Sequence, residues 1–173
     1  MACLSGYTLK GISLDCNANL AGIKEAYLAY KDDITIEVDE DAQNVTALTA
    51  TEGKGFYKYT FAKQTGSLTS TLTKDEANGT RYYTNSVALQ FNKMEAAKHL
   101  EVNAMAAEAL VGIIVDNNGK RWLVGYDSYL SASGATAQSG DSYDSLNGYT
   151  VTLDAMSAYL PFEVPSTITI PVA

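Results

Sequence analysis

The sequence predicts a mainly β protein, a β-sandwich or open barrel of two packed antiparallel sheets with one α-helix on its flank. Three observations predict it. The chain holds 12 tyrosines and is rich in threonine, and both residue types favour strands. Several segments alternate apolar and polar residues, and one Ala-rich stretch lacks glycine and proline. Residues 1–173 fit a single domain, because no Pro/Ser-rich linker interrupts them.

The N-terminal third holds two candidate elements. Residues 23–31 fit either a short helix or a strand, because Ala26, Leu28 and Tyr30 also alternate. Residues 34–38 alternate and predict a strand, and the acidic run at 39–41 predicts a turn.

The middle of the chain predicts a long β meander over about residues 55–92. Turn signals at 64–66 and 75–79 divide it into three strands. Each strand has one apolar face. These faces hold Tyr57, Tyr59 and Phe61 in the first strand, Leu68 and Leu72 in the second, and Tyr83, Val87, Leu89 and Phe91 in the third.

A helix is predicted over residues 93–110, which are Ala-rich and free of glycine and proline. Asn92 is the expected N-cap, with Glu95 completing a pattern like a capping box. Its narrow apolar stripe predicts close packing on a sheet. The stripe consists of Met94, Ala97, Leu100 (or Glu101), Ala104 and Ala107.

The C-terminal third predicts a hairpin and further strands. Residues 111–116 and 120–125 flank Asn117, Asn118 and Gly119, which accept positive φ in a tight turn. Residues 131–146 are rich in Ser, Gly, Ala and Asp and predict a loop. Residues 148–154 alternate as a strand, residues 156–164 predict the last long strand, and Ile168 and Ile170 predict a short tail strand.

Charge is unevenly distributed along the chain. The formal net charge is −8; residues 1–52 hold nine acids and three bases, residues 53–100 three acids and seven bases, and residues 101–173 eight acids and two bases. A basic middle between acidic flanks allows the middle of one copy to meet the flank of another. The alternative is uneven decoration of the surface. Charged residues make up only 18%, which suits a surface that meets neighbours.

No pattern of catalytic residues stands out. His99 is the only histidine and lies within the predicted helix. A Ser-His-Asp or Cys-His arrangement would have to use this residue. No His/Cys cluster has metal spacing. Asp116–Gly119 starts like a calcium loop, but Gly125 stands where that loop needs a glutamate. Trp122 and the tyrosines suit core and interface packing, with base or sugar stacking as the alternative. We therefore expect no enzyme and no cofactor.

The sequence also indicates where the chain is made. No signal peptide is visible at its start, and no run of 18 apolar residues predicts a membrane helix. Cys3 and Cys16 are the only cysteines, and sequence alone leaves open whether they pair. We expect assembly in a cytosol.

Two regions of the chain resemble structural proteins of phages and prophages of gut Bacteroidales. The first is residues 10–29 (KGISLDCNANLAGIKEAYLA). The second is residues 111–125 (VGIIVDNNGKRWLVG), followed by 131–140 (SASGATAQSG) and 147–153 (NGYTVTL). The order of elements also resembles the tail-tube fold of long-tailed phages and contractile injection systems.

The resemblance implies a virion structural protein of the tail-tube type. In that family two sheets carry a flanking helix, a long arm reaches a neighbour, and six copies close a ring around a lumen. By that resemblance the 55–92 meander supplies lumen strands and an arm. The expected partners are other copies, other tail proteins and viral DNA that passes without specific binding, with no membrane; the expected location is the virion tail, assembled in the bacterial host cytoplasm.

Two other functions stay open at this point: a capsid decoration or connector (stopper-ring) protein, and a carbohydrate-binding β-sandwich. If the meander reaches a neighbour, its bases are expected to meet acids of the flanks across the interface. The bases are Lys54, Lys58, Lys63, Lys74 and Arg81, and the acids include Asp39, Glu40, Asp41, Asp141 and Asp144.

Overall fold

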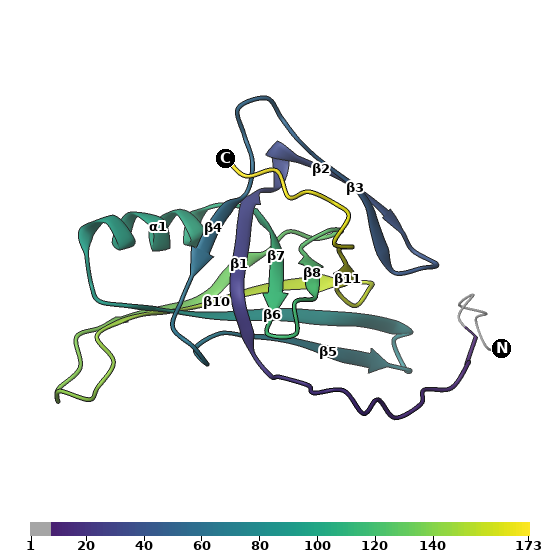
Figure 1. Ribbon diagram of the computed structural model, residues 1–173, viewed down its shortest axis with the longest axis horizontal. Coiled ribbons are helices and arrows are strands. Elements are labelled where there is room, and N and C mark those ends of the chain that lie inside the picture. The colour runs from purple at the N-terminus through teal and green to yellow at the C-terminus, as the bar shows by residue number, and fades with distance from the viewer. Residues whose placement is uncertain (1–7) are drawn as a thin grey trace.

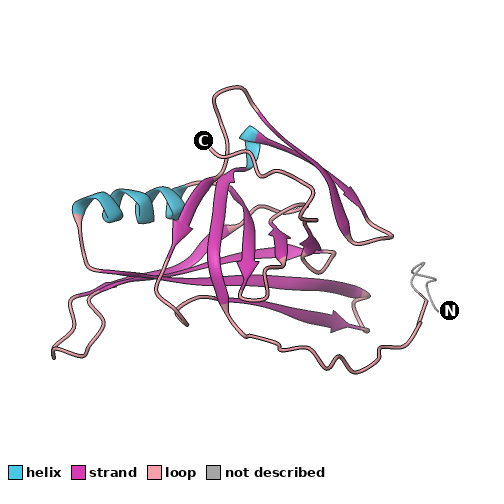
Figure 2. Cartoon of the chain, viewed as in Figure 1, coloured by secondary structure: helices cyan, strands magenta, loops and turns pink. Residues whose placement is uncertain are grey.

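The computed structural model describes residues 8–173 as two β-sheets and one α-helix, with no closed barrel among them. The larger sheet has seven strands in the order β2-β3-β11-β8-β7-β1-β4, and the smaller has four in the order β5-β6-β10-β9 (Figures 1 and 2). The strands are β1 (Ile23–Tyr30), β2 (Ile34–Asp39), β3 (Asn44–Ala50), β4 (Tyr57–Thr60), β5 (Ser67–Asp75), β6 (Thr80–Asn92), β7 (Leu110–Asp116), β8 (Arg121–Val124), β9 (Ser131–Gln138), β10 (Gly148–Ser157) and β11 (Phe162–Glu163). The mainly β prediction is thus confirmed.

The seven-stranded sheet is mixed, which corrects the prediction of two antiparallel sheets. The short strand β11 pairs parallel to β3 and antiparallel to β8. Residues 23–31, which the sequence left open, form β1, and the 3-10 turn η1 (Lys31–Asp33) leads into β2. Residues 34–38 form a strand, as predicted. The predicted hairpin also forms, with β7 and β8 paired on either side of residues 117–119.

The predicted meander over 55–92 divides between the two sheets. β4 pairs with β1 in the larger sheet, whereas β5 and β6 form a hairpin in the smaller one. The prediction of one continuous meander is therefore wrong. The pairing of β4 with β1 is non-local, and the alternation of apolar residues within β4 carries no information about its partner.

Two hydrophobic cores lie on opposite faces of the seven-stranded sheet. The first joins the two sheets: Ala26, Leu28 and Ile114 of the larger sheet cluster with Leu89 and Val151 of the smaller. The second lies on the other face and includes residues from β2, β3, β11 and the C-terminal segment. The predicted long strand at 156–164 is interrupted, with only Phe162–Glu163 forming the short β11 after β10, and no strand forms at Ile168 and Ile170. β10 ends at Ser157, and the two isoleucines pack beside the second core as irregular chain.

The helix α1 (Ala96–Ala107) is shorter than predicted, and it buries a different face. Glu95, not Asn92, is the N-cap, and its side chain makes no capping bond. Met105 is buried at 3% exposure, whereas Leu100 is 72% exposed. The buried side therefore centres on Met105, and the predicted stripe through Leu100 faces largely outward.

Local contacts explain this orientation of the helix. The Tyr149 hydroxyl accepts a hydrogen bond from the Glu95 backbone N–H at 3.1 Å, and it lies 3.2 Å from the Glu95 carbonyl oxygen. The His99 ring stands edge-on to the Tyr149 ring, 5.4 Å between centroids. α1 lies against β9, so these contacts from β10 and β9 fix which side of the helix faces the sheet.

Residues 131–138 form strand β9, although the sequence predicts a loop there. The residues of β9 opposite Leu153, Val151 and Tyr149 of β10 are Ala132, Ala135 and Ala137. Ala135 and Ala137 are exposed beside a hollow of about 340 Å³ between β9 and the helix, so this edge strand needs no large apolar side chain. β9 therefore lacks the apolar alternation by which strands are recognised.

Candidate assembly surfaces

The N-terminal arm, residues 8–20, extends away from the body of the protein (Figure 1). All thirteen residues are exposed. Leu9, Ile12 and Leu14 are 101%, 102% and 93% exposed. Three large apolar side chains within six residues are thus almost fully exposed to solvent. Such a group indicates an interaction segment, whereas single apolar residues scattered over a surface do not.

The base of the arm is held by the β7–β8 turn. The Leu20 backbone N–H donates to Asn118 Oδ1 at 2.8 Å, and Asn118 Nδ2 donates to Asn19 Oδ1 at 2.8 Å. Asn117 Nδ2 donates to the Ala21 carbonyl at 2.6 Å. The arm thus leaves the body at a fixed point. The sequence predicted the turn but not this second role of its asparagines.

The smaller sheet ends in two edges that have no strand partner within residues 8–173. β5 is one edge and β9 is the other. All three pairings in this sheet are antiparallel, so β5 and β9 run in opposite directions. A β9 strand from a second copy can therefore add to β5 and continue the antiparallel alternation. Unpaired edges are liabilities that proteins cover or pair.

The outer face of the smaller sheet, which points away from the first core, carries small and hydroxyl-bearing side chains. Its only charged residues are Asp154 and, at the end of β5, Asp75. The residues of this face are Ser67, Thr69, Thr71, Thr73 and Asp75 on β5; Thr80, Tyr82, Thr84, Ser86, Ala88, Gln90 and Asn92 on β6; Gly148, Thr150, Thr152, Asp154 and Met156 on β10; and Ser131, Gly134, Thr136 and Gln138 on β9.

Asp154 sits in the middle of this face, between Ser86 of β6 and Ser131 of β9 in register. Its Oδ1 atom is buried and has no hydrogen-bond partner in the structure. The outer face of one copy thus carries two carboxylates, Asp154 and Asp75, and no lysine or arginine. Such a surface offers a DNA backbone no cation to bind.

An interlayer trough opens between the two sheets beside β5. Its middle hollow has a volume of about 460 Å³ and includes Leu68, Trp122, Leu160 and Pro161 in its lining. A hollow of about 270 Å³, which shares Leu68 and Trp122, continues to the base of the arm. A third, of about 300 Å³, shares Leu160 and continues to Arg81. We use the name interlayer trough for these three joined hollows.

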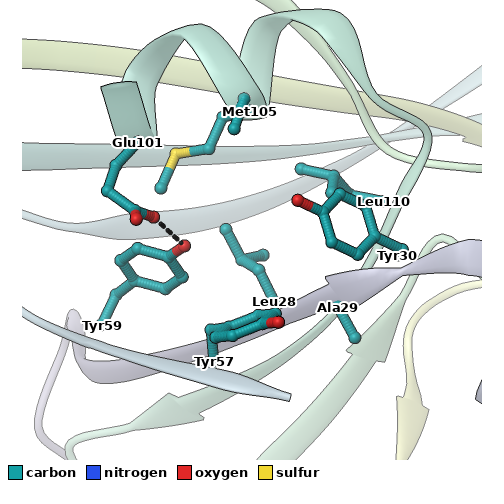
Figure 3. A pocket seen from close by; sticks show the side chains of 9 residues that line it. Leu28, Ala29, Tyr30, Tyr57, Tyr59, Glu101, Met105 and Leu110 are labelled. Atoms are coloured by element: carbon teal, nitrogen blue, oxygen red, sulfur yellow. Dashed lines mark hydrogen bonds between the residues drawn. The ribbon is translucent and has the colours of Figure 1, made fainter. Parts of the chain in front are cut away.

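A smaller pocket lies beneath the helix, between α1, β1 and β4 (Figure 3). The Tyr59 hydroxyl donates to Glu101 Oε2 at 2.8 Å. Burial, together with this bond to the carboxylate, raises the pKa of Tyr59 far above its usual value, so the hydroxyl stays protonated at neutral pH. The volume of about 190 Å³ is below that of usual ligand pockets. The hydrogen bond between Tyr59 and Glu101 links β4 to the helix.

Three of the predicted interface bases have acidic partners within their own chain. Lys58 Nζ lies 2.9 Å from Glu25 Oε1, Lys74 Nζ 2.6 Å from Glu76 Oε1, and Lys54 Nζ 3.7 Å from Asp33 Oδ2. The bond to Glu25 raises the pKa of Lys58. Lys63 and Arg81 are exposed and form no ion pair within the described chain.

The predicted acids lie in two exposed loops. Asp39 Oδ1 accepts hydrogen bonds from the backbone N–H groups of Asp41 and Ala42, each 3.0 Å long, and so shapes the β2–β3 turn with Glu40 at its tip. Asp141 and Asp144 accept bonds from Ser145 and Ser142 in the β9–β10 loop. In Figure 1 the two loops lie at opposite ends of the long axis. No predicted base pairs with a predicted acid within the described chain, and contacts between copies stay a prediction.

Other chemistry is sparse in the described part of the chain. His99 packs on Tyr149, and residues 8–173 hold no cluster of three side chains able to bind a metal. Cys16 is exposed and unpaired, while Cys3 lies outside the described residues. No helix in the described range is long and apolar enough to cross a membrane.

Comparisons with protein-family models, with curated proteins and with solved structures give no match to this chain. What the chain does is therefore inferred from its own surfaces and from the sequence resemblance given above.

Proposed function

We propose that this chain is a virion structural protein of the tail-tube type, whose copies close into stacked hexameric rings around a channel for viral DNA. The observation that carries the proposal is the four-stranded sheet with two unpaired, oppositely directed edges and a nearly uncharged outer face. The unpaired edges support closure of a ring, and the nearly uncharged face supports passage of DNA.

Ring closure follows from pairing β5 of each copy with β9 of the next. The contact joins two different surfaces, and such heterologous contacts close into rings when the rotation between copies permits. Six copies of a four-stranded sheet, at about 4.8 Å per strand, give a ring about 115 Å around and about 37 Å across at the backbone. Strand tilt widens it further. Most side chains of the face are serine, threonine or alanine, and the longer Tyr82, Gln90, Gln138 and Met156 narrow the channel where they stand.

The wall of such a channel is suited to a polyanion that passes without stopping. Affinity of proteins for DNA comes largely from lysines and arginines that neutralise phosphates. The outer face holds none, and its two acidic residues, Asp154 and Asp75, repel phosphate. Repeated around a ring, these carboxylates make the channel wall weakly negative, so DNA passes through the channel without binding to it.

Light scattering of the purified protein tests self-assembly directly. We expect a mass of six chains or of stacked multiples of six. A capsid decoration protein would bind capsids instead of forming open-ended tubes, and a connector would stop at a single ring per virion. Copy number per virion separates these from a tube, while a strictly monomeric species at high concentration and moderate salt argues against the whole proposal.

A further inference from the structure

We propose that the N-terminal arm of one copy lies in the interlayer trough of a second copy. This inference rests on the proposed self-assembly and names its contact. It assigns a place to the two apolar surfaces that a single chain leaves uncovered: the leucine and isoleucine side chains of the arm, and the trough between the sheets.

The arm has the chemistry and the length for this contact. Ile12 and Leu14 share one side when the arm is extended, because side chains alternate along an extended chain, and both are fully exposed. From its anchor at Leu20 to residue 8 the arm reaches about 40 Å when extended. That is enough to cross to a neighbouring copy.

Part of the wall of the trough is apolar and can accept these side chains. Leu68 projects from β5, Trp122 from β8, and Leu160 and Pro161 from the chain between β10 and β11, around one elongated hollow. Leu160 is 48% exposed, and the remaining lining of the hollow includes the polar residues Asn44, Ser70 and Glu163. The trough lies on the inner side of β5, whereas pairing with a neighbouring β9 uses the backbone edge of β5. Both contacts are therefore compatible in one ring.

The occupant is a second copy because the arm's own base is fixed. Asn19, Leu20 and Ala21 are held by hydrogen bonds to Asn117 and Asn118, and from there the arm runs outward past the end of the β5–β6 hairpin in Figure 1. Asn19 and Leu20 line the near end of the chain's own trough, but Leu9, Ile12 and Leu14 farther along the arm are exposed and lie outside it. Exchange between copies leaves the bonds intact and repeats from copy to copy.

Cross-linking between two different chains tests the exchange. In a background of Cys3→Ser and Cys16→Ser, one chain carries Ile12→Cys on the arm and the other carries Leu160→Cys in the trough. The two proteins are mixed and oxidised mildly, and light scattering of the same samples records assembly. The matched control places Glu52→Cys, in the exposed β3–β4 loop, in the second chain.

We expect a disulfide-linked heterodimer from the arm and trough pair at least ten times as abundant as from the arm and loop pair. Assembly without that product overturns the arm contact and leaves the proposed ring intact. A protein that neither assembles nor cross-links overturns both. If a chain with both substitutions forms the bond only within itself, at monomer mass, the arm folds onto its own trough and the exchange is wrong.

Tryptophan fluorescence gives a second, independent readout, because Trp122 in the trough is the only tryptophan of the chain. The full chain carrying Leu9→Ser, Ile12→Ser and Leu14→Ser keeps the trough but loses the apolar arm. A synthetic peptide of residues 8–20 should shift its emission saturably, and a peptide with the same three serines should not. Equal responses to the two peptides contradict the proposal.

Discussion

The Asn118 side-chain oxygen accepts a 2.8 Å hydrogen bond from the backbone N–H of Leu20, so the β7–β8 turn fixes the point where the arm leaves the body. The same side chain donates back to Asn19. A turn that reverses the chain between two strands thus also fixes where the exposed residues 8–20 leave the body.

Asn118→Ala should therefore affect assembly more than folding. Exposed hydrogen bonds of this kind contribute about 0.5–1.5 kcal/mol each, so the unfolding free energy should fall only slightly. The arm loses its direction, and the assembly rate measured by light scattering should fall several-fold. Asn103→Ala, on the exposed side of α1, is the control. Equal assembly rates for the two variants would show that the tether has no role.

Met105 should carry the contact of the helix with the sheets. Met105→Ala removes a buried side chain and should cost about 2–5 kcal/mol in unfolding free energy. Leu100→Ala, at an exposed position on the same helix, should change stability by about 0.5 kcal/mol or less. Chemical denaturation of both variants measures the difference. If Leu100→Ala were the more damaging substitution, the helix would face the sheet by the stripe that the sequence predicts.

Tyr59 should make stability depend on pH only in the alkaline range. Burial and the bond to Glu101 raise the pKa of Tyr59 in the folded chain, so the unfolded chain loses this proton first. The contribution of Tyr59 is fully present below its unfolded pKa of about 10 and is lost as pH rises above it. Tyr59→Phe should lose about 1 kcal/mol at neutral pH and decline less steeply than the wild type above pH ~10. Parallel declines in denaturation series from pH 7 to 11 would argue against a buried Tyr59.

Lys63 and Arg81 are the bases best placed to test charged contacts between copies, because neither has an acidic partner in the described part of its own chain. Lys63→Glu with Arg81→Glu should slow assembly at low salt while the melting temperature stays unchanged. Each exposed pair contributes only about 0–1 kcal/mol, so the effect is on rate more than on final extent.

Lys58→Glu is the contrasting variant. Its substitution breaks the pair with Glu25 and should lower stability as well. If the variant with both Lys63→Glu and Arg81→Glu assembled at the wild-type rate, these charges would have no role in assembly. Higher salt should slow wild-type assembly modestly.

The outer face of the four-stranded sheet should control whether assembled rings hold DNA. Thr71→Lys and Thr152→Lys add two cations per copy to that face. Rings of this variant should retain duplex DNA at low salt in a gel-shift assay and release it steeply as salt rises. Thr46→Lys and Thr169→Lys, at exposed positions outside that sheet, should bind less. Equal binding by the two variants would mean that the face does not line the channel.

The sequence indicated those elements whose signal is local. The alternation Tyr149, Val151 and Leu153 identifies β10, and Asn117–Gly119 identifies the turn of the β7–β8 hairpin. Both depend on residues next to each other in the chain, where side-chain period and turn chemistry decide the structure.

Features that depend on distant partners escaped prediction. β9 is a strand because β10 pairs with it, and the exposed Ala135 does not reveal this partner. The helix turns Met105 toward the sheets because Tyr149 bonds to Glu95 at its start and Tyr59 bonds to Glu101 in its middle. The exposed arm was also missed, because the sequence 8–20 shows its apolar residues but not that the body leaves them uncovered.

Negative-stain electron microscopy of the purified, unmodified protein tests the central claim most directly. We expect class averages of closed rings with sixfold symmetry and a stain-filled centre, and stacks of such rings at higher concentration. The width expected at the channel wall is about 37 Å or more at the backbone, from the strand spacing of a sheet. Fields of single particles of monomer size, at a concentration where light scattering also reports one chain, would contradict the account.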